Sequence, residues 1–199
     1  ISRRLLEAAR RALGRAVLRC ESKQHMALKA TIFKAQVQIS DMERGYYADH
    51  ALTLARHPSE TDERMMLRIT AFALNADPAL EFGKGLSDED EPGLWQKSLT
   101  GTIEHWIEVG LPEVKRLRKA CGRARDVCVY AYGRGAGIWW RQAGEDLARH
   151  ENLVVWTIPV EASQALAALT SRNMKLQFTV QDGVIFVSDE KRSIQIEPQ

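Results

Sequence analysis

Acidic side chains occur at three separate places in this sequence, and a basic segment follows the last of them. Glu63 comes shortly after a Pro-Ser turn, the stretch 88–91 holds four consecutive acids, and Glu108 lies near the end of an alternating stretch. Residues 112–125, which come next, are rich in lysine and arginine. Carboxylate oxygens and waters are the ligands that Mg²⁺ and Mn²⁺ prefer, and a nearby lysine can position or deprotonate the attacking water. The pattern favours a metal site for phosphodiester hydrolysis.

These acids also have a structural interpretation, which the sequence leaves open. Glu63 would be well placed near the positive end of a helix dipole. Glu108 shares a strand face with Trp106, where a carboxylate is costly unless it is paired, metal-bound or hydrated. An ion pair with Arg116 or Lys119 of the following segment would meet that requirement. The alternative to a metal site is therefore a structural set of ion pairs.

The elements that carry these acids can be predicted from periodicity. Alternating, β-branched and aromatic residues predict strands at 27–39, 46–54, 102–109, 126–132, 153–158, 175–180 and 184–188. Helical spacing and capping residues predict helices at 60–75, 112–125, 136–148 and 161–170. Strands that alternate with helices between flanking hairpins predict an α/β or α+β domain around one mixed sheet flanked by helices.

The predicted helix 60–75 is apolar on two sides. Met65 and Ile69 belong to one apolar face, while Leu67 belongs to a second apolar stripe that Glu63 heads. A helix of this kind is typical of a position between two layers. We therefore expect Glu63 to project inward from the first turn.

Composition restricts the class of protein. The chain has 199 residues, of which 45% are hydrophobic and 27% are charged, as expected for one ordinary globular domain. No apolar run approaches the roughly 18 residues of a membrane span, so no membrane partner is expected. The three cysteines show no CxxC or CxxH spacing. That usage favours a reducing compartment and predicts a cytoplasmic location.

Charge is distributed unevenly along the chain. Residues 1–25 carry seven Lys/Arg and two Asp/Glu, whereas residues 26–199 carry 21 basic and 24 acidic residues. A mildly acidic body disfavours an extensive nucleic-acid footprint but allows a local basic patch. Met26 has the appearance of a translation start, so we expect residues 1–25 to be an addition from cloning or upstream translation. An extra packed helix and an Arg-rich transit peptide are the alternatives, and residues 26–199 should form a single domain.

The body of the chain resembles the bacterial YaeQ family from Met26 to about Glu197. The stretches that carry the resemblance are MALKATIFKA (26–35), LTLARHPSETDERMMLR (52–68), DEPGLW (90–95), IEHWIEVGLPEVKRLRKAC (103–121), IWW (138–140) and QDGVIFVSD (181–189). Runs of this length are far more specific than a short motif.

This resemblance implies a variant of the PD-(D/E)XK, or restriction-endonuclease-like, nuclease fold. Its core has the order αβββαβ, with a site at the open end of the middle strands. On that pattern Asp90 takes the first acidic position, Glu108 takes the (D/E) position, and Glu63 matches the helix glutamate of many members. The resemblance thus implies that these three acids hold Mg²⁺ or Mn²⁺.

Two departures from the family pattern affect the functional expectation. No proline precedes Asp90, and Gly110 occupies the position of the final lysine of the motif. Lys115 or Lys119 on the next helix, or Lys97, would have to replace that lysine as general base or phosphate contact. The leading hypothesis is a metal-dependent nuclease. The alternative is a non-catalytic binding or regulatory protein on the same fold, with nucleic acid or a protein as its partner.

Overall fold

The structure, a computed structural model, describes residues 30–84 and 90–199, so the predicted segment 1–25 lies outside the described residues. The strands are β1 (Thr31–Asp41), β2 (Tyr46–Arg56), β3 (Leu80–Phe82), β4 (Leu94–Lys97), β5 (Ile103–Val109), β6 (Ala124–Tyr132), β7 (Leu153–Ile158), β8 (Asn173–Gln181), β9 (Val184–Ser188) and β10 (Ser193–Ile196). The helices are α2 (Asp62–Leu74), α3 (Val114–Cys121), α4 (Ala136–Leu147) and α5 (Val160–Ala167).

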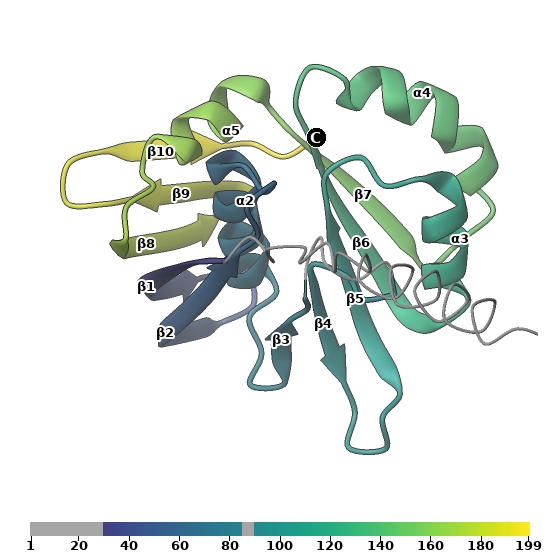
Figure 1. The fold of residues 1–199 in the computed structure, drawn as a ribbon, viewed down its shortest axis with the longest axis horizontal. Helices are drawn as coiled ribbons and strands as arrows, with labels where there is room; N and C mark the ends of the chain where they lie inside the picture. The colour runs from purple at the N-terminus through teal and green to yellow at the C-terminus, as the bar shows by residue number, and fades with distance from the viewer. Residues whose placement is uncertain (1–29, 85–89) are drawn as a thin grey trace, which may run out of the picture.

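The strands form two five-stranded sheets, whereas the sequence predicted one. The first sheet has the order β10-β9-β8-β1-β2 and the second has the order β3-β4-β5-β6-β7 (Figure 1). The prediction of one sheet is wrong because β8 pairs in parallel with β1, so the C-terminal strands return to the opening hairpin instead of joining β7. The α+β class and the mixed strand directions are confirmed.

Helix α2 fills the space between the two sheets, as its two-sided apolar pattern predicted (Figure 1). All its residues from Met65 to Ala73 are buried. They share one core with β1 residues such as Val37 and with β5 residues such as Ile107. A helix that is apolar on several sides needs apolar layers on both sides, and the two sheets supply them.

The two sheets differ in how they are covered. Helices α3 and α4 cover the outer face of the second sheet, where Trp106 packs in one core with Leu117 and Leu147 (Figure 1). In the first sheet, alternate residues of β1 are buried against α2 and exposed on the opposite face. The second sheet is therefore enclosed on both faces, while the outer face of the first sheet meets solvent.

Three of the strands were not predicted from the sequence. β3, β4 and β10 have three or four residues each, which is too short for alternation to be recognised. β4 also has an irregular register against β5 at Gln96 and Lys97. In the part of the chain that the structure describes, no helix has the length and apolar character needed to cross a membrane.

Candidate functional site

The second sheet brings the end of the acidic loop to the end of β5. β4 runs antiparallel to β5 with Leu94 opposite Ile107, and β6 runs parallel to β5. In an antiparallel pair, the residues that precede Leu94 lie beside those that follow Ile107. Asp90 and Glu91 therefore lie near Glu108, at the edge where β5 leads into α3.

Glu108 is buried and held by two donors on the α3 side of the sheet. The residue is only 4% exposed, and its Oε1 accepts hydrogen bonds from Trp106 Nε1 at 2.9 Å and Arg116 Nε at 2.7 Å. Trp106 reaches Glu108 because residues two apart on a strand share a face. Arg116 extends from α3, and its Nη2 also donates to the carbonyl oxygen of Glu91 at 2.7 Å. The ion pair between Glu108 and Arg116 that the sequence offered as an alternative is confirmed.

Asp90 and Lys119 form an ion pair at the surface. The hydrogen bond from Lys119, together with its positive charge, holds the pKa of the Asp90 carboxyl below its ordinary value. Lys115 lies one turn earlier on the same exposed side of α3. Of the two lysines predicted as general base or phosphate contact, Lys119 is thus engaged by an acid, and Lys115 faces solvent.

Gly110 occupies the position at which the family resemblance implied a lysine. Its φ is +115°, a conformation that residues with a side chain rarely adopt. The backbone N–H of Gly110 still donates to the carbonyl oxygen of Tyr130 at 3.0 Å, so the chain turns away directly at the end of β5. A lysine at this position would be strained, and the turn therefore requires glycine.

Glu63 lies on the opposite side of the second sheet from Glu108. Its Oε1 accepts a hydrogen bond at 2.5 Å from Ser163 Oγ of α5. Val109 packs in the core that contains α2, whereas Trp106 packs in the core that contains α3. Because successive strand residues face opposite ways, Glu108 points toward α3 and away from α2. The structure therefore brings Asp90 and Glu108 together around α3 and leaves Glu63 in the first turn of α2.

The metal site formed by Glu63, Asp90 and Glu108 stays a prediction, and the geometry shows only how these acids are now arranged. Within residues 30–84 and 90–199, no group of three or more His, Cys, Asp or Glu side chains is arranged to hold a metal ion. Asp90 and Glu108 each contact a cation of α3, and Glu63 faces another layer. The three acids do not fit one shared ion in this arrangement.

A second buried acid, Glu60, lies between the sheets. Its Oε1 accepts from Arg64 Nη1 at 2.7 Å, and its Oε2 accepts from Arg68 Nη2 at 2.9 Å. Burial lowers the pKa of the Arg68 guanidinium, and the charge of Glu60 opposes that effect. The spacing of four residues between Glu60 and Arg64 is a sequence signal for the first of these contacts.

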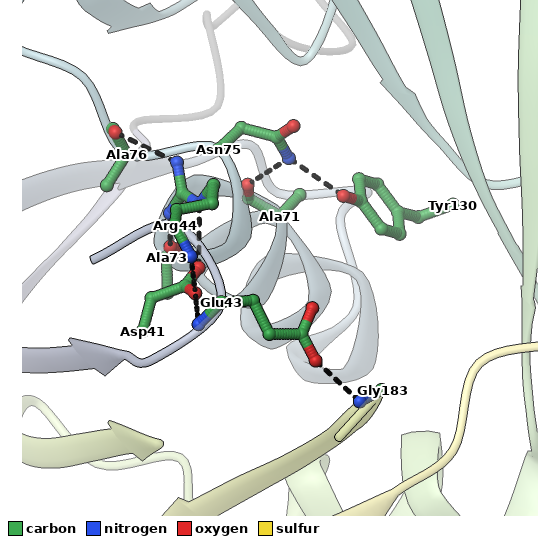
Figure 2. A network of polar contacts seen from close by, with 9 residues as sticks. All are labelled: Asp41, Glu43, Arg44, Ala71, Ala73, Asn75, Ala76, Tyr130 and Gly183. Atoms are coloured by element: carbon green, nitrogen blue, oxygen red, sulfur yellow. Dashed lines mark hydrogen bonds and ion pairs between the residues drawn. The ribbon is translucent and has the colours of Figure 1, made fainter. Parts of the chain in front are cut away.

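A further polar network, which the sequence did not indicate, joins the β1–β2 turn to the end of α2 (Figure 2). Arg44 Nε donates to Asp41 Oδ2 at 2.6 Å, and its two other nitrogens donate to the carbonyl oxygens of Ala73 and Ala76 at 3.2 Å. Carbonyl groups at the end of a helix have no partner within it, so Arg44 caps α2. Burial would raise the pKa of the Asp41 carboxyl, but hydrogen bonds from Arg44 and Glu43 outweigh it and hold that pKa low.

The same network extends to the second sheet. Asn75 Nδ2 donates to Tyr130 Oη at 2.8 Å (Figure 2). Burial raises the pKa of Tyr130, and it raises the pKa of Cys128 to about 12. A cavity of about 390 Å³, lined also by Trp156, opens beside these residues. The network therefore links the β1–β2 turn, the end of α2 and the second sheet.

These features define an α+β protein with two mixed sheets around one helix and an ion-paired acidic cluster beside α3. The chain belongs to the YaeQ protein family, whose model matches residues 26–198.

Relatives in other bacteria agree with this assignment. The chain is 48% identical over 173 residues to the uncharacterized protein YaeQ of Salmonella typhi, which covers 86% of this chain and 96% of that protein. It is 46% identical over 172 residues to the protein of the same name from Escherichia coli K12, with 86% and 95% covered.

Two crystal structures of YaeQ proteins have a similar fold. The protein from Xanthomonas axonopodis pv. citri has a TM-score of 0.83 and 47% identity, with 85% of this chain and 97% of that chain covered. The protein from Pseudomonas syringae has a TM-score of 0.82 and 35% identity, with 85% and 94% covered.

Proposed function

We propose that this chain is a non-catalytic binding protein on a nuclease-type core, and that it contacts nucleic acid without cutting it. The element order α2-β3-β4-β5-α3-β6 supports the core, because it has the αβββαβ order that the family resemblance implied. The pairing directions are antiparallel, antiparallel and then parallel. The observation that carries the proposal is the binding of Arg116 to Glu108.

Arg116 supplies at Glu108 the positive charge that a metal ion would otherwise supply. Its Nε lies 2.7 Å from Oε1, the same oxygen that accepts from the indole of Trp106. A divalent cation at that oxygen would have to displace the guanidinium and leave it next to a second positive charge. Such a rearrangement is costly for partly buried groups. The pair thus favours binding over hydrolysis.

The segment that contains α3, β6 and α4 is rich in positive charge, and α3 alone supplies four of its Lys/Arg residues and none of its acids. Residues 110–149 hold nine Lys/Arg and four Asp/Glu, a net charge of +5, while the rest of 26–199 holds 12 and 20, a net charge of −8. α3 and α4 are joined by the bond from Arg118 Nη2 to Asp146 Oδ1 at 2.7 Å.

Several cations of this region are exposed and, among the described residues, form no ion pair with an acid: Lys115, Arg123, Arg134, Arg141 and Arg149. Phosphate groups bind such side chains without sequence preference. Trp140 on α4 is 39% exposed and offers a ring on which a base can stack.

The test is fluorescence anisotropy with labelled single- and double-stranded DNA and RNA, in EDTA and in Mg²⁺. We expect binding at low salt that weakens as salt rises. The double variant Lys115→Glu/Arg141→Glu should bind at least about tenfold more weakly and lower the salt slope by about two. The matched control Lys34→Glu/Lys175→Glu makes the same charge change on the first sheet and should bind as wild type does. Failure to bind, or an equal loss in the control, would contradict the proposal.

A metal-dependent nuclease is the second candidate, because the sheet does bring Asp90 and Glu108 to one edge. Calorimetric titration of Mg²⁺ and Mn²⁺ into wild type and Glu108→Ala separates the two candidates. The binding protein predicts no metal uptake that depends on Glu108, and intact DNA and RNA after incubation with metal. Uptake that disappears in Glu108→Ala, together with cleavage of either substrate, would favour the nuclease.

A further inference from the structure

The outer edge of β2 is a long strand edge that no described residue covers with backbone hydrogen bonds. β2 has eleven residues and pairs with β1 without interruption from Arg56 to Tyr46. The other outer strands are shorter: β10 has four residues, β3 has three, and β7 has six, with Thr157 exchanging two hydrogen bonds with Gln199. β2 is thus the longest edge in the part of the chain that the structure describes.

The hydrogen bonds between β1 and β8 determine which residues of β2 point their backbone groups outward at this edge. The backbone N–H of Lys34 donates to the carbonyl oxygen of Arg172, which directly precedes β8, and the N–H of Met42 donates to that of Val180 in β8. The even-numbered residues of β1 therefore point their backbone N–H and C=O groups toward β8. Odd-numbered residues of β1 therefore bond to even-numbered residues of β2, given the observed register. The odd-numbered residues of β2 point their N–H and C=O groups outward: Tyr47, Asp49, Ala51, Thr53 and Ala55. All five side chains are exposed.

This edge lacks the features that usually prevent pairing between strands of different molecules. Proteins protect long edges with proline, lysine, bulges or covering loops. β2 contains no proline and no lysine, and its register has no bulge. Its only acid is Asp49, and its only strong base is Arg56 at the end.

We propose that β2 pairs antiparallel with β2 of a second copy of this chain, so that the two first sheets form one continuous sheet. In the register centred on Ala51, Tyr47 faces Ala55 of the second copy, Asp49 faces Thr53, and Ala51 faces its own equivalent. All five odd-numbered residues then form hydrogen-bonded pairs, and each pair exchanges two bonds.

The side chains of β2 complement one another in this register. Large residues oppose small ones: Tyr47 faces Ala55, and Leu54 faces Ala48 on the inner face. Asp49 meets the hydroxyl of Thr53, a polar pair that favours strand association.

Other registers are poorer. A shift by two residues forms fewer bonds, and in one direction it places His50 opposite its own equivalent. A shift by four in that direction places Asp49 opposite Asp49, and like charges directly opposite are destabilising. Self-complementarity in the register of greatest overlap selects a second copy as the occupant of this edge.

The first test is the mass of the full chain in solution, measured by light scattering and sedimentation from about 1 to 100 µM. We expect a dimer of twice 22.5 kDa. Ala51→Pro removes an outward N–H without loss of a bond to β1, and Ala51→Lys places two ammonium groups opposite each other. Both variants should be monomers. Gln36→Lys lies on the neighbouring strand opposite Ala51 and makes the same charge change, so it should remain a dimer.

A cysteine placed at the symmetry axis tests the register. In Ala51→Cys the two Cα atoms would lie about 5.5 Å apart, within the range of a disulfide, whereas in Thr53→Cys they would lie about 14 Å apart. Mild oxidation should cross-link Ala51→Cys at least about tenfold faster than Thr53→Cys or wild type.

Three results would overturn the proposal: a monomeric wild type at all concentrations, a dimer that persists in both Ala51 variants, or equal cross-linking at the two positions. Circular dichroism of Ala51→Lys and Gln36→Lys verifies that a change of mass does not come from unfolding.

Discussion

Two glutamates are buried to almost the same degree on opposite sides of the second sheet, and their cationic partners differ. Glu60 is 5% exposed and meets Arg64 and Arg68, while Glu108 is 4% exposed and meets Arg116 and the indole of Trp106. The side chain of Arg68 is 4% exposed, whereas that of Arg116 is 25% exposed. Burial of the acid is therefore the same in both pairs, and burial of the cation is not.

The comparison shows that a buried carboxylate does not by itself mark a functional site. Glu60 lies in a closed position between the sheets, where its pair with Arg68 links the start of α2 to its middle. Glu108 lies at an edge of the second sheet, where solvent reaches the cation. A ligand can compete only for a pair that solvent can reach, so the exposure of the cation separates structural pairs from candidate sites.

The largest effect should come from breaking the enclosed pair. Arg68→Leu leaves Glu60 buried with one fewer cation. Removal of one member of a buried ion pair typically costs about 3–5 kcal/mol, so we expect the unfolding free energy to fall by that amount. Denaturant unfolding at neutral pH measures this change. The matched control is Arg64→Leu, which removes the other, more exposed arginine from the same acid. A loss below about 1 kcal/mol in Arg68→Leu would show that Glu60 is not held by the interior pair.

A smaller loss is expected at the partly exposed pair. Arg116→Leu removes one charged hydrogen bond to Glu108 and one to the Glu91 carbonyl, which together cost about 2 kcal/mol because solvent can replace part of them. Arg118→Leu on the same helix breaks a pair between exposed side chains and should change stability by less than about 1 kcal/mol. If Arg116→Leu were as costly as Arg68→Leu, the distinction between the two glutamates would fail.

Sequence reasoning predicted α2 and α3 and most of the longer strands because their periodicity extends over enough residues. It also offered Arg116 or Lys119 as a partner for Glu108, since an acid beside Trp106 on a buried face requires compensation, and the structure shows Arg116 in that role. It did not predict two sheets, because the parallel pairing of β8 with β1 joins segments 139 residues apart and leaves no local signal.

The candidate site was predicted only in part for a similar reason. Proximity of Asp90 to Glu108 was expected from the family resemblance, and in the structure it follows from the antiparallel pairing of β4 with β5, which the sequence did not predict. The placement of Glu63 depends on which face of β5 the helix α2 covers, and that depends on the position of the whole first sheet. The network of Arg44 and Asn75 joins three distant segments and had no pattern in the sequence.

A third buried acid extends the comparison through pH. Asp41 is buried, and the side chain of its partner Arg44 is 39% exposed. The folded-state pKa of Asp41 lies below 3.8, so the unfolded state binds more protons in acid. Its stabilisation is present above the ordinary pKa and is lost as pH falls through the lowered folded pKa.

The variant Asp41→Asn should therefore cost about 1 kcal/mol at neutral pH and less as the pH falls below about 4. Unfolding free energies of wild type and variant across this range measure the difference. A cost that does not change with pH would assign the role of Asp41 to its backbone contacts and not to its charge.

The smallest effect on stability should come from the most exposed of these ion pairs, the pair of Asp90 with Lys119. Both side chains are largely exposed, so Lys119→Ala should leave the unfolding transition unchanged, because solvent screens the charges in both states. The pKa of Asp90 should nevertheless rise toward 3.8, since the hydrogen bond and charge of Lys119 are what lower it. Carbon-13 NMR titration of the Asp90 carboxyl measures that rise, with Lys115→Ala as the control that should not produce it. If the pKa of Asp90 stays low in Lys119→Ala, other positive charges near α3 lower it. Asp90 would then resemble Glu108, whose ion pair is only partly exposed, more than an acid in an isolated surface pair.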